Sequence, residues 1–485
     1  MSAPAAPGRT DASPSAGEAK ASVLARVAVR FTAFAERWLP DAFVFALGAT
    51  VLVFVAGVAI GEPPVKLVEA WGTGFPELLA FTMQMALVIV TGYVVASSRP
   101  IYRAIGWIAD RAPHSPRGAV ATVALFAMVS SWFNWGFSLI FSAVLAKELA
   151  RRTRGVDYRA LAAASFLGLG SVWAQGLSGS AALQMATASA LPKAVRDIVA
   201  HDGAIPDGIV RFDHTIFLWQ SLAAVAIEIV VVTVVMALAA PRGAAARDAA
   251  ALGIDLGPPL DRADELPPPR TPGERIEHSP ALMLAIAALG ATYLALSLRK
   301  TGITGLTVNT INLAMLLVGF VLHGTPARLM KAVREATPAT WGVLLQFPFY
   351  GAISGMIAST ALNAKIAHLF VGVSTKLTFP ALVAAYSAVL GVFVPSGGGK
   401  WIIEAPYVIR AAHEMGAHIG WTVSCYDLGE AIANLVQPFW MLPVLALLGL
   451  RARDVMGFTF LVALVLFPVV LTLVTVLGAS LPYPL

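Results

Sequence analysis

The stretch VPSGGGKWIIEAP, residues 394–406, decides how this chain is expected to fold. It follows an apolar run over residues 379–393 and interrupts it with a proline, a serine, three glycines and a lysine. Proline ends a helix, and glycine allows backbone turns that other residues avoid. Non-helical backbone inside a bilayer is tolerated only where protein buries it or water reaches it. The stretch therefore predicts a re-entrant tip, at which polar backbone groups are available at membrane depth.

The composition is that of a membrane protein. Of the 485 residues, 58% are hydrophobic and 13% are charged, whereas soluble domains are about half apolar and about a quarter charged. Stretches long and apolar enough to cross a bilayer cover residues 41–60, 77–97, 214–239, 280–298, 307–322, 340–360, 423–448 and 456–478. The chain is therefore predicted to be an all-α polytopic membrane protein with about 9 transmembrane helices plus two re-entrant hairpins.

Polar segments divide the rest of the chain. Residues 1–39 are predicted to form a disordered tail followed by an interfacial amphipathic helix, which carries Arg26, Arg30 and Arg37. Residues 241–279 are polar and proline-rich, which indicates a linker. Basic residues gather in short loops beside apolar helices, and such loops lie in the cytoplasm together with the linker. This placement of charge also argues against a nucleic-acid partner.

The two halves on either side of the linker resemble each other when one is laid on the other without gaps. Matching prolines and glutamines are rare by chance in an apolar background. A single constant shift matches Pro64 with Pro326, Pro76 with Pro338, Gln84 with Gln346, and Gln175 with Gln437. We therefore predict an internal repeat, with residues 40–240 as the first copy and residues 280–485 as the second.

The same shift gives the opening stretch a counterpart, SSWFNWGFSLIF at residues 130–141, in which Asn134 aligns with Ser396 and Gly136 with Gly398. Both loops around the first break are strongly basic, so a hairpin over residues 118–148 that enters and leaves on the cytoplasmic side keeps both inside. The second hairpin, residues 379–409, then enters from the opposite side. Such inverted repeats with broken helices are typical of secondary transporters.

The tips offer binding groups for a small anion. Freed amides at a helix start attract anions, and the carbonyls left by the incoming helix can hold a cation such as Na⁺; no other metal site is expected. Close packing through small residues is the alternative interpretation of the glycines. The predicted substrate or ion-binding residues are Asn134, Gly136, Gln175, Ser178, Ser396, Gly397, Gly398, Gly399, Lys400, Asn434 and Gln437.

A polar stripe precedes the predicted helix break at residues 434–440. Asp427, Glu430, Asn434 and Gln437 are spaced 3, 4 and 3 apart, which places them on one helix face. Acidic groups at membrane depth usually face a polar interior, so Asp427 and Glu430 are candidates for ion coupling; alternatively they lie near the headgroups and face water. Lys400 is either the counter-charge of the substrate or the partner of Glu404 in an ordinary salt bridge.

Several motifs resemble the short-chain fatty acid transporter family: VPSGGGKWIIEAPYVI, VQPFWMLP, LQFPFYGAI, NWGFSLIF and GLSGS. The resemblance extends from Arg37 to the last helix. It implies a multi-pass carrier of the bacterial inner membrane that takes up monocarboxylates such as butyrate or acetoacetate. It also implies paired hairpins that hold the substrate and a transport domain that moves like an elevator against a scaffold.

Together these observations predict a secondary active transporter whose partners are a short-chain carboxylate and the lipid bilayer. Coupling to Na⁺ or to H⁺ is open, no other cofactor is expected, and a homodimer is a candidate assembly. A carrier of another small anion, either a dicarboxylate or an inorganic ion, is the alternative. A membrane-embedded enzyme acting on acyl groups is disfavoured, because the sequence has no HExxH, no GxSxG and no clustered Cys and His.

Overall fold

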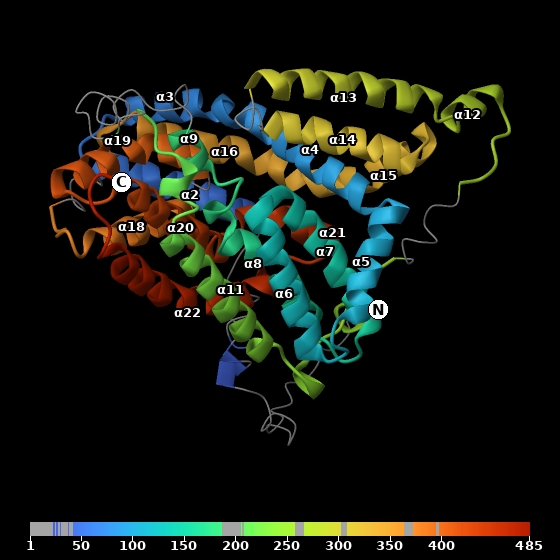
Figure 1. Cartoon of the computed structure of the whole chain (residues 1–485), viewed down its shortest axis with the longest axis horizontal. Coiled ribbons are helices and arrows are strands. Elements are labelled where there is room, and N and C mark those ends of the chain that lie inside the picture. Colours follow the sequence, from blue (N-terminus) through green and yellow to red (C-terminus); the bar gives the residue numbers. More distant parts are fainter. Residues whose placement is uncertain are drawn as a thin grey trace, which may run out of the picture.

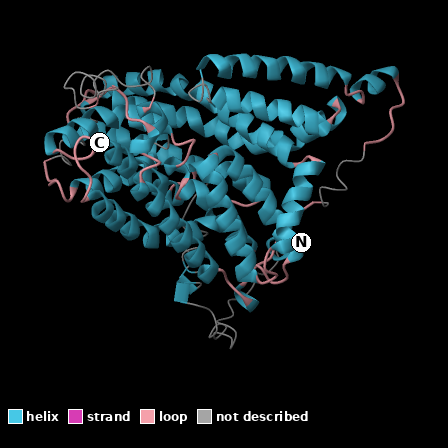
Figure 2. Ribbon diagram, in the orientation of Figure 1, coloured by secondary structure: helices cyan, strands magenta, loops and turns pink. Residues whose placement is uncertain are grey.

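The computed structural model describes residues 42–186, 205, 208–257, 266–301, 308–362, 372–393 and 397–485, and six positions between 23 and 37. All regular secondary structure in these residues is helical (Figure 2). Ser396, the predicted tail over residues 1–22 and residues 258–265 of the linker lie outside the described residues. The all-α class predicted from the sequence is confirmed for the described part of the chain.

The described first half consists of helices of 6 to 21 residues and of short 3-10 helices. Proline stands in the first turn of α3, α5 and α6, where its missing N–H removes no hydrogen bond. The elements are α2 Ala42–Ala59, α3 Pro64–Gly74, η2 Phe75–Leu78, α4 Leu79–Ala96, α5 Arg99–Arg111, α6 Pro116–Phe133, α7 Trp135–Arg152, α8 Tyr158–Gly170, η3 Trp173–Gln175, α9 Ser180–Met185, η6 Phe212–His214 and α11 Trp219–Ala239.

The described residues of the linker contain three short helices, and the second half follows them. In the linker lie η7 Gly243–Ala245, η8 Ala250–Leu252 and α12 Pro272–Glu277. The second half comprises α13 Ala281–Thr301, α14 Val308–His323, α15 Pro326–Ala336, η10 Thr337–Thr340, α16 Trp341–Ala358, α18 Phe379–Phe393, α19 Gly397–Met415, α20 Ile419–Val436, η11 Phe439–Met441, α21 Leu442–Leu448 and α22 Ala452–Gly478.

Helix starts recur at the spacing of the sequence match. Helix α3 begins at Pro64 and α15 at Pro326, two prolines that the sequence match pairs. The same separation holds between the starts of η2 and η10, of α4 and α16, and of α7 and α19. Four helix starts of the first half thus recur in the second half at the same spacing. That the two copies are inverted in the membrane stays a prediction.

The helices pack in two groups (Figure 1). In one group, α16 contacts α2, α3 and α4, while α14 lies between α13 and α4. In the other, α6, α7 and α8 contact one another, and α20 packs between α18 and α22. Helix α11 joins the second group through α6 and α22. Figure 1 shows α13, α14 and α4 along one edge of the molecule and α22 along the other.

Glycines, which have no side chain, allow helices of the second group to pack close together. A Cβ atom on Gly168 would lie 2.2 Å from the carbonyl oxygen of Ala127, where α8 crosses α6. A Cβ atom on Gly429 would lie 2.0 Å from the carbonyl oxygen of Ala384, where α20 crosses α18. Small residues at such crossings are the usual means of packing helices in a membrane. The close approach fixes α20, which carries the polar stripe, against α18.

Long uninterrupted helices are fewer than the predicted spans. By length and composition, four helical segments of the described chain can cross a membrane: Tyr158–Met185, Trp219–Ala239, Pro272–Lys300 and Ala452–Gly478. The number rises to six if two bent pairs each form one span. One of these pairs, Ile419–Val436 with Phe439–Leu448, is bent by 72° at Gln437 and Pro438. The prediction of about 9 spans is therefore not established, whereas the break predicted in residues 434–440 is present.

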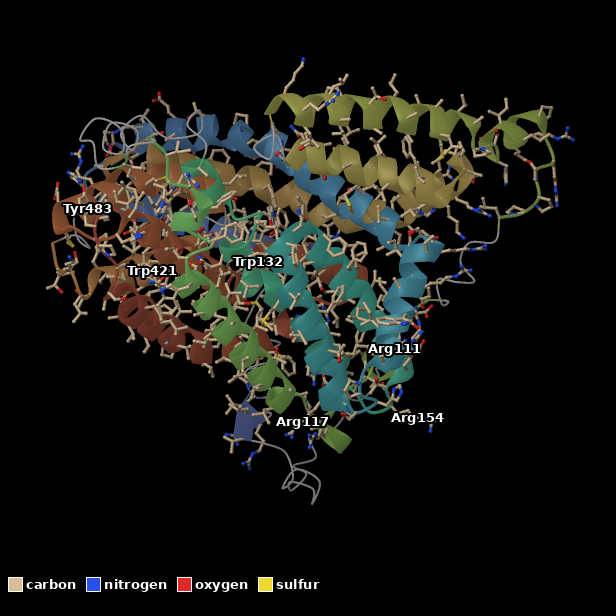
Figure 3. All side chains as sticks on the ribbon, in the orientation of Figure 1. Arg111, Arg117, Trp132, Arg154, Trp421 and Tyr483 are labelled. Carbon is tan, nitrogen blue, oxygen red and sulfur yellow. The ribbon has the colours of Figure 1, made fainter. Side chains whose placement is uncertain are left out.

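The described part of the linker is attached to the first half. The carboxylate of Asp157 accepts hydrogen bonds from the backbone N–H of Arg247 at 3.1 Å and from two amides at the start of α8. Arg151 donates to the carbonyls of Leu256 and Gly257. Figure 3 shows Arg111, Arg117 and Arg154 at the same end of the molecule. The basic loops of the first half thus gather at one end, together with the beginning of the linker.

Candidate functional site

A buried lysine lies at the centre of the polar groups. The Nζ atom of Lys400, in the first turn of α19, is 2.5 Å from Oε2 of Glu430 on α20 and 3.5 Å from Oε1 of Glu404. It also donates hydrogen bonds to the backbone oxygen and the Oγ atom of Ser387 on α18, at 2.7 and 2.8 Å. All three charged side chains are completely buried. The salt bridge to Glu404, one of the two alternatives drawn from the sequence, is therefore present, and the role of Lys400 as the counter-charge of the substrate stays a prediction.

Aromatic contacts complete the surroundings of this lysine. Its ammonium lies 4.7 Å from the ring centre of Tyr426, a cation–π distance. The hydroxyl of Tyr426 donates to the carbonyl of Gly397 at 2.6 Å, which ties α20 to the start of α19. Ser387 in turn donates to the backbone oxygen of Tyr426 at 2.9 Å. The sequence analysis did not identify Ser387 or Tyr426, because neither stands out in an apolar helix.

Acidic groups outnumber the lysine. Glu404, Asp427 and Glu430 are at most 2% exposed. Both carboxyl oxygens of Glu404 and Oδ2 of Asp427 have no hydrogen-bond partner among the described residues. Isolated ionised groups are very costly to bury, so buried charges are normally paired. One ammonium cannot balance three carboxylates, and the cluster therefore requires protons or another cation to approach neutrality. The alternative in which Asp427 and Glu430 face water is wrong for this structure.

The amide side chains of the stripe support the helix break. Asn434 donates to the carbonyl of Leu169 in α8 at 3.0 Å, and Gln437 donates to Oδ1 of Asn434 at 2.9 Å. The N–H of Phe439 donates to Oε1 of Gln437 at 2.7 Å, which satisfies an amide freed by the break. Gln175 donates to the carbonyl of Ser424 at 3.0 Å. These amides connect the two halves of the chain at the level of both breaks.

The first predicted tip is a short break between α6 and α7. Asn134 caps α7, because its side-chain oxygen accepts a hydrogen bond from the N–H of Phe137 at 2.9 Å. The N–H of Trp135 donates to the hydroxyl oxygen of Ser178 at 3.2 Å. Helices α6 and α7 contact each other along the pair. The first tip thus contacts Ser178 through the backbone of Trp135, and binding of substrate or ion by Asn134, Gly136 and Ser178 stays a prediction.

The second tip differs from the expectation. Gly397, Gly398 and Gly399 form the first turn of α19, and none of them has a positive φ angle. The glycines instead allow close contacts with the first half. A Cβ atom on Gly397 would lie 2.7 Å from the ring of Trp173, and the carbonyl of Gly398 accepts a hydrogen bond from Gln184 at 3.0 Å. The prediction of special turn conformations is therefore wrong for these three residues, since small size rather than backbone freedom is what the contacts require.

Trp173 lies between the two tips. Its ring is 6.4 Å from that of Trp135 beside the first tip, and it borders Gly397 at the second. Trp440, next to the break in the second half, also contacts Trp135, with ring centres 5.4 Å apart. Neither Trp173 nor Gln184 was among the residues predicted from the sequence. Tryptophan is common in membrane proteins as an interfacial anchor, so only its place just before Gln175 could have drawn attention to it.

Comparison with known proteins gives the relationship directly. The family described as "Short chain fatty acid transporter" matches residues 23–477. A protein of Escherichia coli (strain K12) named "Putative short-chain fatty acid transporter" is 39% identical over 459 residues, covering 93% of this chain and all of that protein. A protein of the same name from Haemophilus influenzae is 36% identical over 440 residues, covering 90% of this chain and 96% of that protein.

Solved structures show a weaker likeness. The YdaH transporter of Alcanivorax borkumensis has a TM-score of 0.45 at 14% identity, with 91% of this chain and 99% of that chain covered. The efflux pump MtrF of Neisseria gonorrhoeae has a TM-score of 0.42 at 14% identity, with 94% and 98% covered. The sequence matches span nearly the whole chain, and the apolar helices agree with a membrane location. The chain belongs to the short-chain fatty acid transporter family.

Proposed function

We propose that this protein is a secondary active transporter that takes up short-chain monocarboxylates such as butyrate or acetoacetate across the bacterial inner membrane. The observation that carries the proposal is the buried ammonium of Lys400, which lies in the first turn of α19 beside the second tip. A carboxylate at a helix start is favoured by free amides and by the helix dipole. Lys400 adds a full positive charge on the same turn.

The same cluster provides a route for coupling. In the structure, the ammonium group of Lys400 forms an ion pair with Glu430. If a proton enters the cluster and neutralises Glu430, the ammonium becomes available to the substrate carboxylate. Proton and substrate then move together, and the total charge of the cluster and its guests does not change. This keeps the cost of buried charge low in both the empty and the loaded carrier. We therefore favour H⁺ over Na⁺ as the coupling ion.

Movement is proposed to follow the two helix groups. The group of α6, α7, α8, α18, α19 and α20 contains the cluster and both tips, and it would move as a unit against the group formed by α2, α4, α14 and α16. Inverted repeats suit such alternating access, because two equivalent arrangements open to opposite sides. Assembly as a homodimer belongs to the same proposal. Another small anion, a dicarboxylate or an inorganic ion, is the alternative cargo.

Uptake of labelled butyrate into proteoliposomes tests the proposal. An inward proton gradient and an inward Na⁺ gradient are imposed separately, and unlabelled acetoacetate, succinate and chloride are used as competitors. We expect the proton gradient to drive accumulation and acetoacetate to compete. Accumulation driven only by Na⁺ would overturn the choice of ion, and competition by succinate alone would overturn the cargo.

Matched variants connect the result to the cluster. Glu430→Gln keeps the size of the side chain but cannot release a proton, so proton-driven accumulation should fall about tenfold or more while exchange of substrate persists. Glu414→Gln changes an exposed glutamate of α19, away from the cluster, and should leave uptake unchanged. If Glu430→Gln accumulates butyrate as well as Glu414→Gln and the unmodified protein do, Glu430 has no part in coupling.

A further inference from the structure

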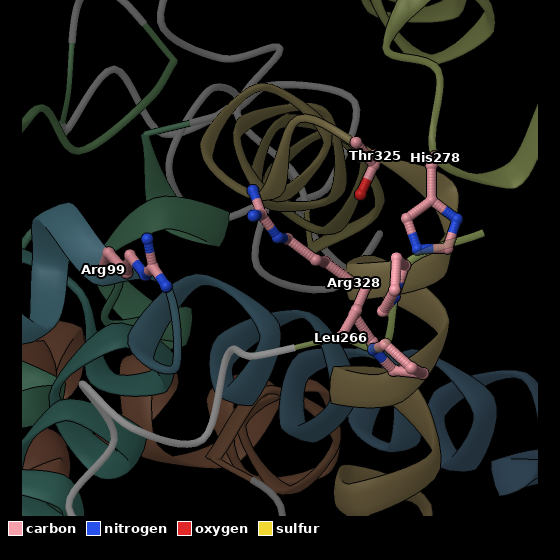
Figure 4. Close-up of a pocket in the computed structure, with 7 residues that line it drawn as sticks. Arg99, Leu266, His278, Thr325 and Arg328 are labelled. Carbon is pink, nitrogen blue, oxygen red and sulfur yellow. The ribbon is translucent and has the colours of Figure 1, made fainter. Parts of the chain in front are cut away.

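A second polar site lies away from the tips, where the end of the linker meets the starts of two helices (Figure 4). It is a cavity of about 410 Å³ lined by residues 266–268 of the linker and by Arg99, His278, Thr325 and Arg328. Arg99 is the first residue of α5, and Thr325 precedes the first residue of α15. Among the described residues, two arginines and no acidic side chain line the cavity, which therefore favours an anion.

Two polar atoms of the lining are left without partners. Oγ1 of Thr325 and Nε2 of His278 are buried and form no hydrogen bond among the described residues. Thr325 is the N-cap residue of α15, yet its side chain makes no capping hydrogen bond. Buried polar groups are normally hydrogen-bonded, and an unpaired one calls for a water or a ligand. The hydroxyl of Thr325 is thus available as a donor to an anion at the positive end of α15.

The histidine indicates a further feature of the ligand. Nδ1 of His278 lies 2.7 Å from the carbonyl oxygen of Glu274. Because a carbonyl only accepts, this contact selects the tautomer in which Nδ1 carries the proton and Nε2 is an acceptor. The cavity therefore presents guanidinium and hydroxyl donors for an anion, together with one acceptor for a hydroxyl or amine of the same ligand.

We propose that this cavity binds a phosphate-bearing ligand that also carries a hydroxyl group close to the phosphate. The planar guanidinium group matches phosphate oxygens through two parallel hydrogen bonds, so Arg328 is the anchor. Thr325 donates to the phosphate, and the ligand hydroxyl donates to Nε2 of His278. This chemistry is shared by the headgroup of phosphatidylglycerol and by a soluble polyol phosphate such as glycerol 3-phosphate.

The neighbouring helix favours the lipid as the source. Helix α13 begins shortly after His278, at Ala281. Leu282, Ile286 and Leu289 are 59%, 51% and 71% exposed and lie on one face of this helix. An acyl chain can cover this apolar face while its headgroup phosphate occupies the cavity. The inference does not depend on the transported substrate, because the cavity is separate from the Lys400 cluster.

The test uses the purified full chain in detergent. Phosphatidylglycerol, phosphatidylcholine or glycerol 3-phosphate is titrated, and the midpoint of thermal unfolding is recorded at each concentration. For Arg328→Gln we expect the apparent dissociation constant for phosphatidylglycerol to rise about tenfold or more, because a charge-assisted pair is lost. Arg334→Gln removes the same charge from an exposed side chain of α15 outside the cavity and should bind like the unmodified protein.

Each outcome decides the proposal. A stabilisation that Arg328→Gln weakens supports it, and the ligand that causes the stabilisation identifies the source as lipid or soluble phosphate. Three results would overturn the proposal. Phosphatidylcholine could stabilise the protein as much as phosphatidylglycerol does. Alternatively, Arg328→Gln could bind as tightly as the unmodified protein, or Arg334→Gln could lose as much affinity as Arg328→Gln. If Arg328→Gln does not fold, Thr325→Val removes only the hydroxyl and should weaken binding about fivefold.

Discussion

The Nζ atom of Lys400 and the Oε2 atom of Glu430 are 2.5 Å apart, and neither side chain is exposed to solvent. The pair joins the first turn of α19 to the middle of α20, beside the point where the second half meets Trp173 and Gln184 of the first. A buried charge that loses its partner is strongly destabilising, whereas replacing both partners is often neutral. The pair therefore couples the stability of the protein to the charge state of the proposed transport site.

Removing the lysine alone should destabilise the protein. Lys400→Gln leaves Glu430 without its cation, and we expect the free energy of unfolding to fall by about 3–5 kcal/mol. The double variant Lys400→Gln with Glu430→Gln should recover part of this loss, because Glu430 no longer leaves an unpaired charge while Glu404 still lacks its lysine. Thermal or denaturant unfolding in detergent measures both effects, and uptake should be lost in both variants. A stable, active Lys400→Gln protein would exclude Lys400 from the mechanism.

Enlarging the second tip should stop transport without unfolding the protein. Gly397→Val places a side chain where even a Cβ atom would lie 2.7 Å from the ring of Trp173, so the tip can no longer approach the first half. We expect butyrate uptake to fall at least about tenfold while the amount of protein in the membrane is unchanged. Gly72→Val, at a helical glycine with open space around it, is the matched control. Normal uptake by Gly397→Val would show that close approach of the tip is not needed.

The amide that supports the helix break should matter for stability. Gln437→Leu removes the acceptor of the Phe439 N–H and the donor to Asn434. A buried amide without a partner costs about 1–3 kcal/mol, so we expect a lower midpoint of thermal unfolding. Gln437→Glu keeps the acceptor for Phe439 but loses the donor to Asn434 and adds an acidic group, and it should be intermediate or worse. An unchanged midpoint in Gln437→Leu would mean that water satisfies the break.

Opposite entry of the two hairpins can be tested by labelling. His114, before α6, and Lys376, before α18, are both exposed. With His114→Cys we expect reaction with a membrane-impermeant thiol reagent only after the cytoplasmic side is opened, whereas Lys376→Cys should react in intact cells. The native Cys425 is completely buried, so the unmodified chain provides a low background. Labelling of both positions from the same side would disprove inverted repeats.

The sequence by itself determined the helical class, the membrane location and the positions of the breaks at Asn134 and at Gln437. These features depend on local chemistry. Apolar runs of bilayer length, prolines at Pro64 and Pro326, and the break at Gln437 and Pro438 act close to where they stand in the chain. The constant shift between the halves, read from a few prolines and glutamines, reappears in the starts of four pairs of helices.

Only the tertiary structure decided which charges meet and what the glycines do. Lys400 could pair with Glu404 one turn away, but its shortest ion pair is with Glu430, which lies on another helix. Gly397 and Gly398 begin a regular helix against Trp173 and Gln184, which belong to the other half of the chain. Contacts of this kind depend on how helices pack in three dimensions, and no periodicity within a single segment records them.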